Sequence, residues 1–166
     1  MSAAMQTDNG SPGSNIASVR TERYRIALPQ VLSDSRHGEM RDFEVITVRI
    51  ADADGVEGVG YTYTTGRGGA AIHALVKQDL APMLLGQESE RIEWLWQRMW
   101  WGVHYGGRGG QTSLAISAVD IALWDLQAKR AGLPLWRYLG GHDPRVPCYA
   151  GGIDLVDGDT DPNESR

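Results

Sequence analysis

The stretch that decides the fold is AISAVDIALWDLQAKRAGLPLWRYLGG, residues 115–141. Apolar side chains occur almost all round its first part until Lys129, and this pattern predicts a long helix buried on most sides. The helix is expected to end at Gly132, because a glycine followed closely by Pro134 is typical of a helix C-terminus. The remaining residues, PLWRYLGG, predict a short second helix.

Two aspartates, Asp120 and Asp125, lie inside this apolar helix. A buried carboxylate has to be hydrogen-bonded or ion-paired, because an isolated one costs too much free energy. Either the aspartates bind a metal or act as a base, or they tie the helix to a neighbouring backbone or arginine. The structural role is favoured, because the Glu-x-x-His pattern of metal-binding helices is absent. Arg108 and Arg130 are the expected partners.

Upstream of the helix, the apolar residues recur with a period of two, which predicts three β-strands. Asp54-Gly55 is a strong signal for a tight hairpin between the last two strands. The polar residues 30–42, between the first two, are expected to form a long loop. The three strands are expected to form an antiparallel meander. Its expected strands are residues 16–29, 43–51 and 57–65.

Between the strands and the long helix, the period changes to about 3.6, and two further helices are expected. The first should end before Pro82, and the second begins with acidic residues, which suits the helix dipole. Residues 104–110 carry four glycines that end the second helix, and Thr112 or Ser113 is the expected N-cap of the long one. Strands followed by helices predict the α+β class, a meander followed by a helical bundle. The apolar face of the first of these helices consists of Ile72, Leu75, Val76 and Leu80. That of the second consists of Ile92, Leu95, Trp96, Met99 and Trp100.

Composition excludes several classes of function. The chain of 166 residues has a formal net charge of −5 and no basic run, which argues against a nucleic-acid partner. A single cysteine, Cys148, permits no intramolecular disulfide and suits a reducing cytoplasm. No apolar stretch reaches the roughly 18 residues of a membrane span, and the N-terminus lacks the pattern of a secretory signal. We expect a soluble cytoplasmic protein with a disordered tail at residues 1–15.

The run SAVDIALWDLQAKRAGLPLWRYLGG, residues 117–141, resembles the signature helix of the enolase superfamily, in its mandelate racemase and muconate-lactonizing branch. The resemblance extends upstream through DADGVEGVGYTY, LAPMLLGQ and ERIEWLWQRMW, and covers about residues 16–150. Within the branch, the segments SDSRHGEM, TTGRGG and YGGRGG are similar to those of acid-sugar dehydratases such as galactarate and talarate dehydratases.

The resemblance implies that residues 16–141 form an enolase-like N-terminal capping domain. In this family the chemistry sits in a following (β/α)₇β barrel, where a Lys-x-Lys pair and three Mg²⁺-binding carboxylates carry out abstraction of the proton α to a carboxylate. Residues 142–166 would supply only a linker, the first strand of the missing barrel at 146–152, and a polar tail. The only lysines are Lys77 and Lys129, so no catalytic residue and no metal ligand is expected in this chain. We therefore expect a truncated product or an isolated domain, without bound Mg²⁺ or activity of its own.

In this family two segments of the capping domain close over the substrate, and here they correspond to residues 32–40 and to about residues 63–69. Their hydroxyl and charged side chains suit a polyhydroxy acid, and Arg36 or Arg67 could hold a carboxylate bidentately. The alternative is that these are ordinary solvated loop residues. The resemblance implies a homo-oligomeric, Mg²⁺-dependent parent enzyme acting on a sugar acid, an acid-sugar dehydratase or alternatively a racemase or muconate-type cycloisomerase. The candidate substrate-binding residues are Ser33, Asp34, Ser35, Arg36, His37, Thr64, Thr65 and Arg67.

Overall fold

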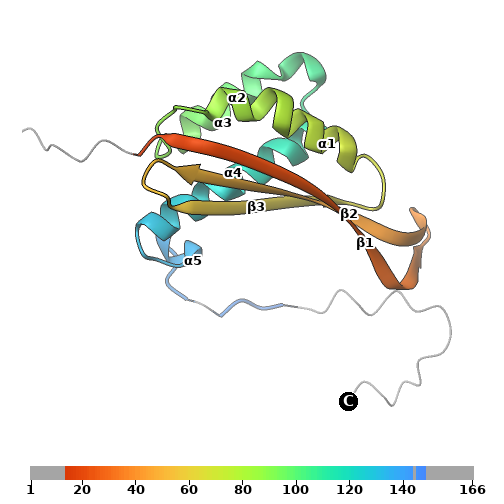
Figure 1. Cartoon of the computed structure of the whole chain (residues 1–166). Helices are drawn as coiled ribbons and strands as arrows, with labels where there is room; N and C mark the ends of the chain where they lie inside the picture. Colours follow the sequence, from red (N-terminus) through yellow and green to blue (C-terminus); the bar gives the residue numbers. More distant parts are fainter. Residues whose placement is uncertain (1–13, 144, 149–166) are drawn as a thin grey trace, which may run out of the picture.

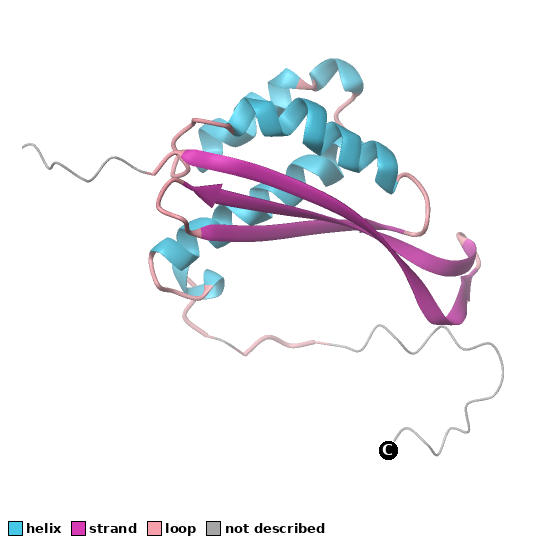
Figure 2. Ribbon diagram, viewed as in Figure 1, coloured by secondary structure: helices cyan, strands magenta, loops and turns pink. Residues whose placement is uncertain are grey.

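The protein is described by a computed structural model that covers residues 14–143 and 145–148. Three strands, β1 (Ile16–Asp34), β2 (Gly38–Asp52) and β3 (Glu57–Thr64), form an antiparallel sheet in the order β1-β2-β3. The helical layer covers one face of this sheet (Figures 1 and 2). The α+β class and the three-stranded meander are therefore confirmed. The helical elements are α1 (Gly69–Leu75), η1 (Val76–Leu80), α2 (Ala81–Leu84), α3 (Ile92–Gly102), η2 (His104–Gly106), α4 (Gln111–Arg130) and α5 (Leu135–Tyr138).

The core lies between the sheet and the helices. Alternate residues of β2 point into it, and the side chains of Ile46, Val48 and Ile50 are fully buried. Ten of the twenty residues of α4 are buried, whereas Leu114, Ser117 and Ile121 are exposed. The helix is therefore buried on one face, not on most sides as its sequence predicts. Its buried face includes Ala115, Val119, Ala122 and Leu126.

Residues 30–42 do not form the long loop that their polarity predicts. Strand β1 continues to Asp34 and β2 begins at Gly38, so the two strands pair almost to the tip of their hairpin. An irregularity between Ala27 and Leu32 contains Pro29, which has no N–H to donate to a strand ladder and is therefore tolerated at such a bulge. We call residues 28–42 the arm, because this part of the hairpin projects beyond the helical layer (Figure 1).

Two helix boundaries also differ from the prediction. The helical segment that begins at Gly69 continues through Pro82, and a π-helical turn, η1, ends at Leu80, two residues before the proline. Such a turn shifts the backbone away from regular α-helical bonding, which the proline ring would disturb. Helix α4 begins at Gln111 with Gly110 as its N-cap, so neither Thr112 nor Ser113 caps it.

The C-terminal end of α4 matches the prediction. Gly132 adopts a φ of +64°, and its N–H donates to the carbonyl of Lys129. The next amide, of Leu133, donates to the carbonyl of Ala128, which completes a glycine-terminated helix end. The predicted hairpin turn at Asp54-Gly55 is also confirmed, with Gly55 at a φ of +85°.

At the chain ends, the described residues begin at Ser14, which is buried, and Asn15 pairs with Glu88 in an isolated β-bridge. The folded body thus starts two residues before the boundary predicted for the tail, and residues 1–13 lie outside the described part. Residues 146–148 carry no regular secondary structure, and the rest of the predicted barrel strand also lies outside it. Among the described helices, none is both long and apolar enough to cross a membrane.

Candidate functional site

Asp125 ties the long helix to the edge of the sheet. Its Oδ2 atom accepts a hydrogen bond from the backbone N–H of Val59 at 2.8 Å. The same oxygen lies 2.8 Å from Nζ of Lys129, and that ammonium donates to the carbonyl of Glu57 at 3.0 Å. Strand β3 is an edge strand, so these two side chains of α4 take up backbone groups that have no neighbouring strand. This explains why an apolar helix contains Asp125.

Two glycines of β3 allow α4 to lie directly on the strand. A Cβ atom at Gly58 would fall 2.1 Å from the carbonyl oxygen of Ala122, and one at Gly60 would fall 2.1 Å from that of Ala118. Only glycine fits at both positions. These two glycines were not among the residues predicted from the sequence to matter. The available signal was a pair of glycines alternating within a predicted strand, which indicates close backbone approach.

The arginines expected beside the helix aspartates have other partners. Arg130 bonds Asp52 at 2.6 Å and Asp54 at 3.0 Å, which closes the turn between β2 and β3 onto the end of α4. The guanidinium of Arg108 lies over the rings of Trp100 and Trp101, at 5.3 and 4.5 Å from their centroids. The predicted pairing of Arg108 or Arg130 with Asp120 or Asp125 is therefore wrong.

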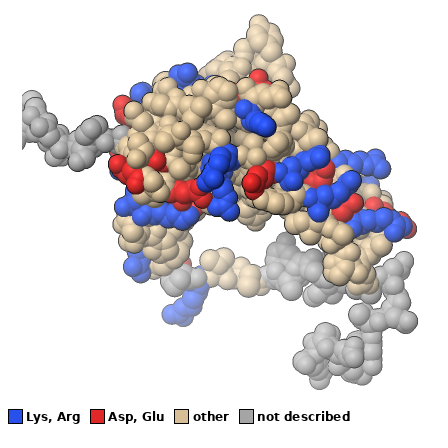
Figure 3. Space-filling view, in the orientation of Figure 1, with Lys and Arg blue, Asp and Glu red and all other residues tan. Residues whose placement is uncertain are grey.

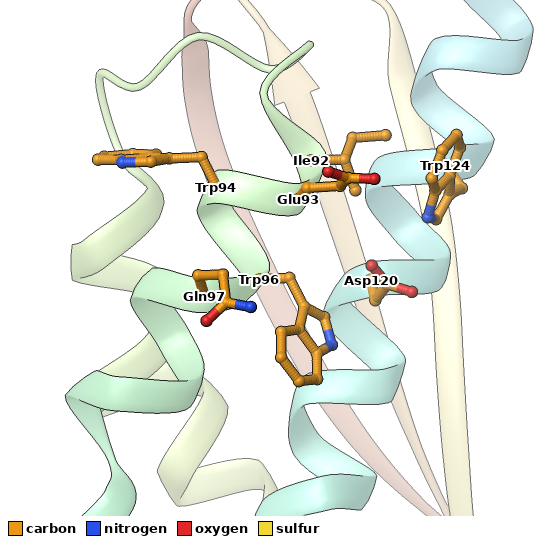
Figure 4. A pocket seen from close by; sticks show the side chains of 7 residues that line it. All are labelled: Ile92, Glu93, Trp94, Trp96, Gln97, Asp120 and Trp124. Carbon is orange, nitrogen blue, oxygen red and sulfur yellow. The ribbon is translucent and has the colours of Figure 1, made fainter.

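Asp120 lies in an open groove of about 480 Å³ between α3 and α4 (Figure 4). Trp96 and Trp124 form its walls beside the carboxylate, whereas Trp94 points away from α4. Burial raises the pKa of Asp120 above its ordinary value, although a hydrogen bond with Trp124 acts in the opposite direction. Within the described residues no lysine or arginine pairs with it. Asp120 is thus a partly desolvated acid in an apolar surface.

Five of the candidate binding residues lie at the tip of the arm, and two of these hold the tip in shape. Asp34 Oδ1 accepts hydrogen bonds from the backbone N–H groups of His37 at 2.5 Å and Arg36 at 2.8 Å. Its Oδ2 lies 2.7 Å from Nδ1 of His37. The bonds from His37, with that from the Arg36 amide, hold the pKa of Asp34 below its ordinary value. Asp34 therefore organises the turn, while the side chains of Ser33, Ser35 and Arg36 are exposed.

The other three candidates belong to residues 63–69, which we call the β3–α1 segment. Thr64 donates to Oε2 of Glu44 at 3.3 Å, and the backbone N–H of Gly69 donates to the same oxygen at 2.9 Å. Glu44 is buried, with 6% of its surface exposed, and its other oxygen bonds Arg23 at 3.2 Å. The side chain of Thr64 is consequently directed toward Glu44, whereas Thr65 and Arg67 are exposed.

The base of the arm and the β3–α1 segment enclose a hollow of about 300 Å³. Arg25 connects its two sides, since Nε bonds Asp42 Oδ1 at 3.0 Å and Nη2 donates to the carbonyl of Gly66 at 3.0 Å. Of the candidate residues, Thr65 and Arg67 line this hollow, and the residues of the arm tip do not. The hollow is completed by residues that the sequence analysis did not select: Arg25, Glu39, Met40, Arg41, Asp42 and Gly66.

Charged side chains of both signs gather in a band that follows the strands to the arm (Figure 3). At the end of the sheet away from the arm, Arg49 and Arg20 bond Glu57 and hold its pKa below the ordinary value. In the part of the chain that the structure describes, no three His, Cys, Asp or Glu side chains gather in a way that could hold a metal ion.

Comparison with known proteins identifies the family. Residues 16–140 match the model of the mandelate racemase/muconate lactonizing enzyme N-terminal domain. The chain belongs to this family. This agrees with the resemblance of the long helix and with the observed sheet and helices.

Several relatives are much longer than this chain. It is 61% identical to a 3,6-anhydro-α-L-galactonate cycloisomerase of Streptomyces coelicolor, over 84% of this chain and 39% of the relative. It is 37% identical to an L-talarate/galactarate dehydratase of Salmonella typhimurium, over 82% of this chain and 35% of the relative. The chain thus spans less than two fifths of the length of either protein.

Solved structures give the same result. A racemase of Streptomyces coelicolor with bound magnesium superposes with a TM-score of 0.81 at 61% identity, over 84% of this chain and 39% of that one. The L-talarate/galactarate dehydratase of Salmonella typhimurium, liganded with Mg and L-lyxarohydroxamate, gives a TM-score of 0.76 at 35% identity, over 86% of this chain and 37% of that one. The fold described above is therefore that of the N-terminal portion of these enzymes.

Proposed function

We propose that this domain caps the active site of a Mg²⁺-dependent enzyme that abstracts the proton α to the carboxylate of a sugar acid. The domain's own part is substrate recognition by the arm and the β3–α1 segment. The metal, held by residues outside the described part of this chain, would stabilise the negative charge that develops on the carboxylate. The observation that carries the proposal is the 61% identity to a cycloisomerase of an anhydro-sugar acid over 84% of this chain.

The chemistry of the hollow supports a polyhydroxy acid. Thr65 offers a hydroxyl, and Glu39 and Asp42 offer carboxylate oxygens that accept hydrogen bonds from substrate hydroxyls. Three arginines line the same space, so the formal charges of its lining residues sum to a positive value, which favours an anion. Arg25 and Arg41 already bond carboxylates of this chain. Arg67 makes no side-chain hydrogen bond to another described residue and is the cation that we propose for the substrate.

Cycloisomerisation of an anhydro-sugar acid is the reaction that we favour, because the identity to that relative is much higher than the 37% to the dehydratase. Dehydration of a diacid such as galactarate is the second candidate. The second carboxylate of a diacid would need a cationic side chain that donates two parallel hydrogen bonds to it. The exposed Arg36 and Arg67 are suitable for this role. Both candidates use the same two segments of this domain.

A chimeric enzyme tests the proposal. Residues 14–141 of this chain would replace the corresponding domain of the Streptomyces coelicolor cycloisomerase, and turnover of 3,6-anhydro-L-galactonate and of galactarate would be measured with Mg²⁺. We expect turnover of the anhydro-sugar acid. Arg67→Ala should raise its KM about tenfold with kcat little changed, because one charge-assisted contact contributes on the order of 1.4 kcal/mol to binding.

Arg91→Ala is the matched control, because Arg91 lies at the start of α3 with its guanidinium over Trp94, away from both segments. Its KM should equal that of the unmodified chimera. A folded chimera that turns over neither acid would refute the proposal, and turnover of galactarate alone would favour the dehydratase.

We also propose that the whole protein is a homo-oligomer, as the family resemblance implies. The sheet face opposite the helices exposes large side chains, among them Tyr24, Ile26, Tyr61 and Tyr63, with 47–59% of their surface accessible. Light scattering coupled to size-exclusion chromatography measures the mass directly, and a monomeric mass at micromolar concentration would contradict the proposal.

A further inference from the structure

The β3–α1 segment is held at two points by side chains of residues that flank the arm, Arg25 of β1 and Glu44 of β2. The first point is Gly66, whose carbonyl accepts a hydrogen bond from Arg25. The second is Gly69, whose N–H donates to Glu44. The exposed residues Thr65 and Arg67 lie beside these two points. The segment is therefore fastened on both sides of its exposed arginine.

Arg25 makes the connection that spans the hollow. It comes from β1, and its fork-shaped guanidinium bonds Asp42 on β2 with Nε and the Gly66 carbonyl with Nη2, both at 3.0 Å. Gly66 is also in close contact with Asp42, because a Cβ atom there would lie 2.7 Å from Oδ1 of the aspartate. A lysine has a single ammonium and could not reproduce the planar fork.

Glu44 fixes the other end of the segment. Gly68, the N-cap of α1, has no side chain to bond the first free amide of the helix, and the carboxylate of Glu44 bonds the Gly69 amide instead. A Cβ atom at Gly69 would lie 2.8 Å from Oε2 of Glu44, so the two residues fit closely. The buried carboxylate of Glu44 thus holds this end of the segment against β2, and the Gly69 amide can exchange only when this bond opens.

We propose that Arg25 is a positioning residue that couples the arm to the β3–α1 segment, so that the two move as one unit over the hollow, with Glu44 as the fixed anchor. This inference deepens the proposed function and rests on it, because the coupling matters for specificity only if both segments contact the substrate. Neither Thr65 nor Arg67 is held by burial, so the hydrogen bonds of Arg25 and Glu44 set the position of the segment.

Amide hydrogen exchange of the 166-residue chain, read by NMR, tests the coupling without a substrate. Arg25→Ala should accelerate exchange about fivefold at Gly69 and equally at the arm amides of residues 39–42, since one hydrogen bond contributes about 1 kcal/mol. In Arg25→Lys, the exchange rates of the arm amides should return to the wild-type values, because a lysine can still form the ion pair with Asp42. The exchange rate at Gly69 should stay as high as in Arg25→Ala. Arg25 is exposed, so both variants should keep the wild-type fold and circular dichroism spectrum.

Arg20→Ala is the matched control. Arg20 lies on the same strand and also bonds a carboxylate, that of Glu57, but it does not touch the segment. Its exchange at Gly69 and at residues 39–42 should equal that of the wild type. The proposal would be overturned if Arg25→Ala accelerated amide exchange in the arm alone. It would also be overturned if Arg20→Ala accelerated exchange as much as Arg25→Ala does.

Kinetics of the chimera separate this inference from the proposed function. Arg25→Ala in the chimera should raise KM severalfold at unchanged kcat, and Arg25→Lys should not rescue it. A chimera without turnover would refute the function while the exchange result still decides the coupling. An active chimera whose KM does not respond to Arg25→Ala would overturn the role of Arg25 alone.

Discussion

The seam between β3 and α4 and the junction between the arm and the β3–α1 segment are held together by different physics. In the seam, Gly58 and Gly60 bring two backbones into contact over buried alanines and leucines. In the junction, Arg25 bonds the Gly66 carbonyl across an open hollow, and the buried Glu44 bonds the Gly69 amide. Close packing forms one region, and a few hydrogen bonds position the other.

This difference separates stability from recognition. Close-packed backbones tolerate almost no change in volume, so the seam should respond to substitution by losing global stability. Side-chain hydrogen bonds near water contribute about 1 kcal/mol each, so the junction can change without unfolding the domain. A scaffold of this kind can keep its fold while residues near the substrate vary.

Gly60→Ala should give the largest effect. The added methyl group would lie 2.1 Å from the carbonyl oxygen of Ala118 and 2.6 Å from the amide nitrogen of Ala122, and backbone atoms cannot rotate away. We expect α4 to be forced off the strand and the free energy of unfolding to fall by about 3 kcal/mol or more. Urea denaturation followed by tryptophan fluorescence measures the change.

Gly109→Ala is the control for that substitution, because no atom lies within 4 Å of the position where its Cβ would be built. It should leave the urea midpoint nearly unchanged. If both alanine variants unfolded at the wild-type midpoint, the seam would not be the rigid part of the molecule.

Asp125→Ala should come second. The backbone N–H of Val59 loses its acceptor, and Lys129 loses its carboxylate. Removing one partner of a partly buried hydrogen bond costs about 1–3 kcal/mol, and we expect about 2. Asp79→Ala, which removes an exposed aspartate of η1, provides the comparison, and an equal loss in the two variants would show that Asp125 is not the tie between helix and sheet.

The sequence was sufficient to predict the seam's elements but not its contacts. The apolar pattern of residues 115–130 predicted the helix but not its exposed face, which includes Ile121, and alternation predicted the strands. That pattern also implied that Asp125 needs a partner. It could not identify the partner, because the amide of Val59 lies 66 residues away and is brought near only by packing. The prediction of an arginine partner failed for this reason.

The arm was the larger failure of the sequence analysis. Its residues are polar, so no alternation distinguishes a strand from a loop, and the strand pairing is supported by the side-chain bonds of Asp34 at the tip. Of the substrate-binding residues proposed from the sequence, Thr65 and Arg67 line the hollow. Arg25 was missed. It lies in a predicted strand and Asp42 in a predicted loop, but both belong to strands in the structure, where they form a diagonal cross-strand pair.

Asp120→Asn should raise the stability of the folded protein slightly, whereas the substitutions above lower it. Burial raises the pKa of Asp120 in the folded protein, so the folded state binds the proton more tightly than the unfolded state. The free energy of unfolding of the wild type therefore falls as pH rises from the ordinary aspartate pKa through the raised pKa of Asp120. Above the raised pKa it falls no further on account of this group. At pH 7 the variant should be more stable by less than about 1 kcal/mol, because the group is partly solvated. The gain should vanish below pH 3.8, the ordinary pKa, and a variant less stable than wild type at pH 7 would contradict this.

The smallest global effect is expected for Asp34, although its local effect at the arm tip should be clear. Its pKa is lowered by hydrogen bonds from His37 and Arg36, so the turn is stabilised above the ordinary pKa of 3.8 and loses that contribution as pH falls through the lowered value. Asp34→Ala should therefore increase the mobility of the tip amides at pH 7, measured by ¹⁵N relaxation, and the wild type should approach the variant only in acid. Thermal unfolding should be nearly the same for both proteins. A lower unfolding temperature, comparable to that of Asp125→Ala, would mean that the arm is part of the cooperative core and that the division between scaffold and recognition region fails.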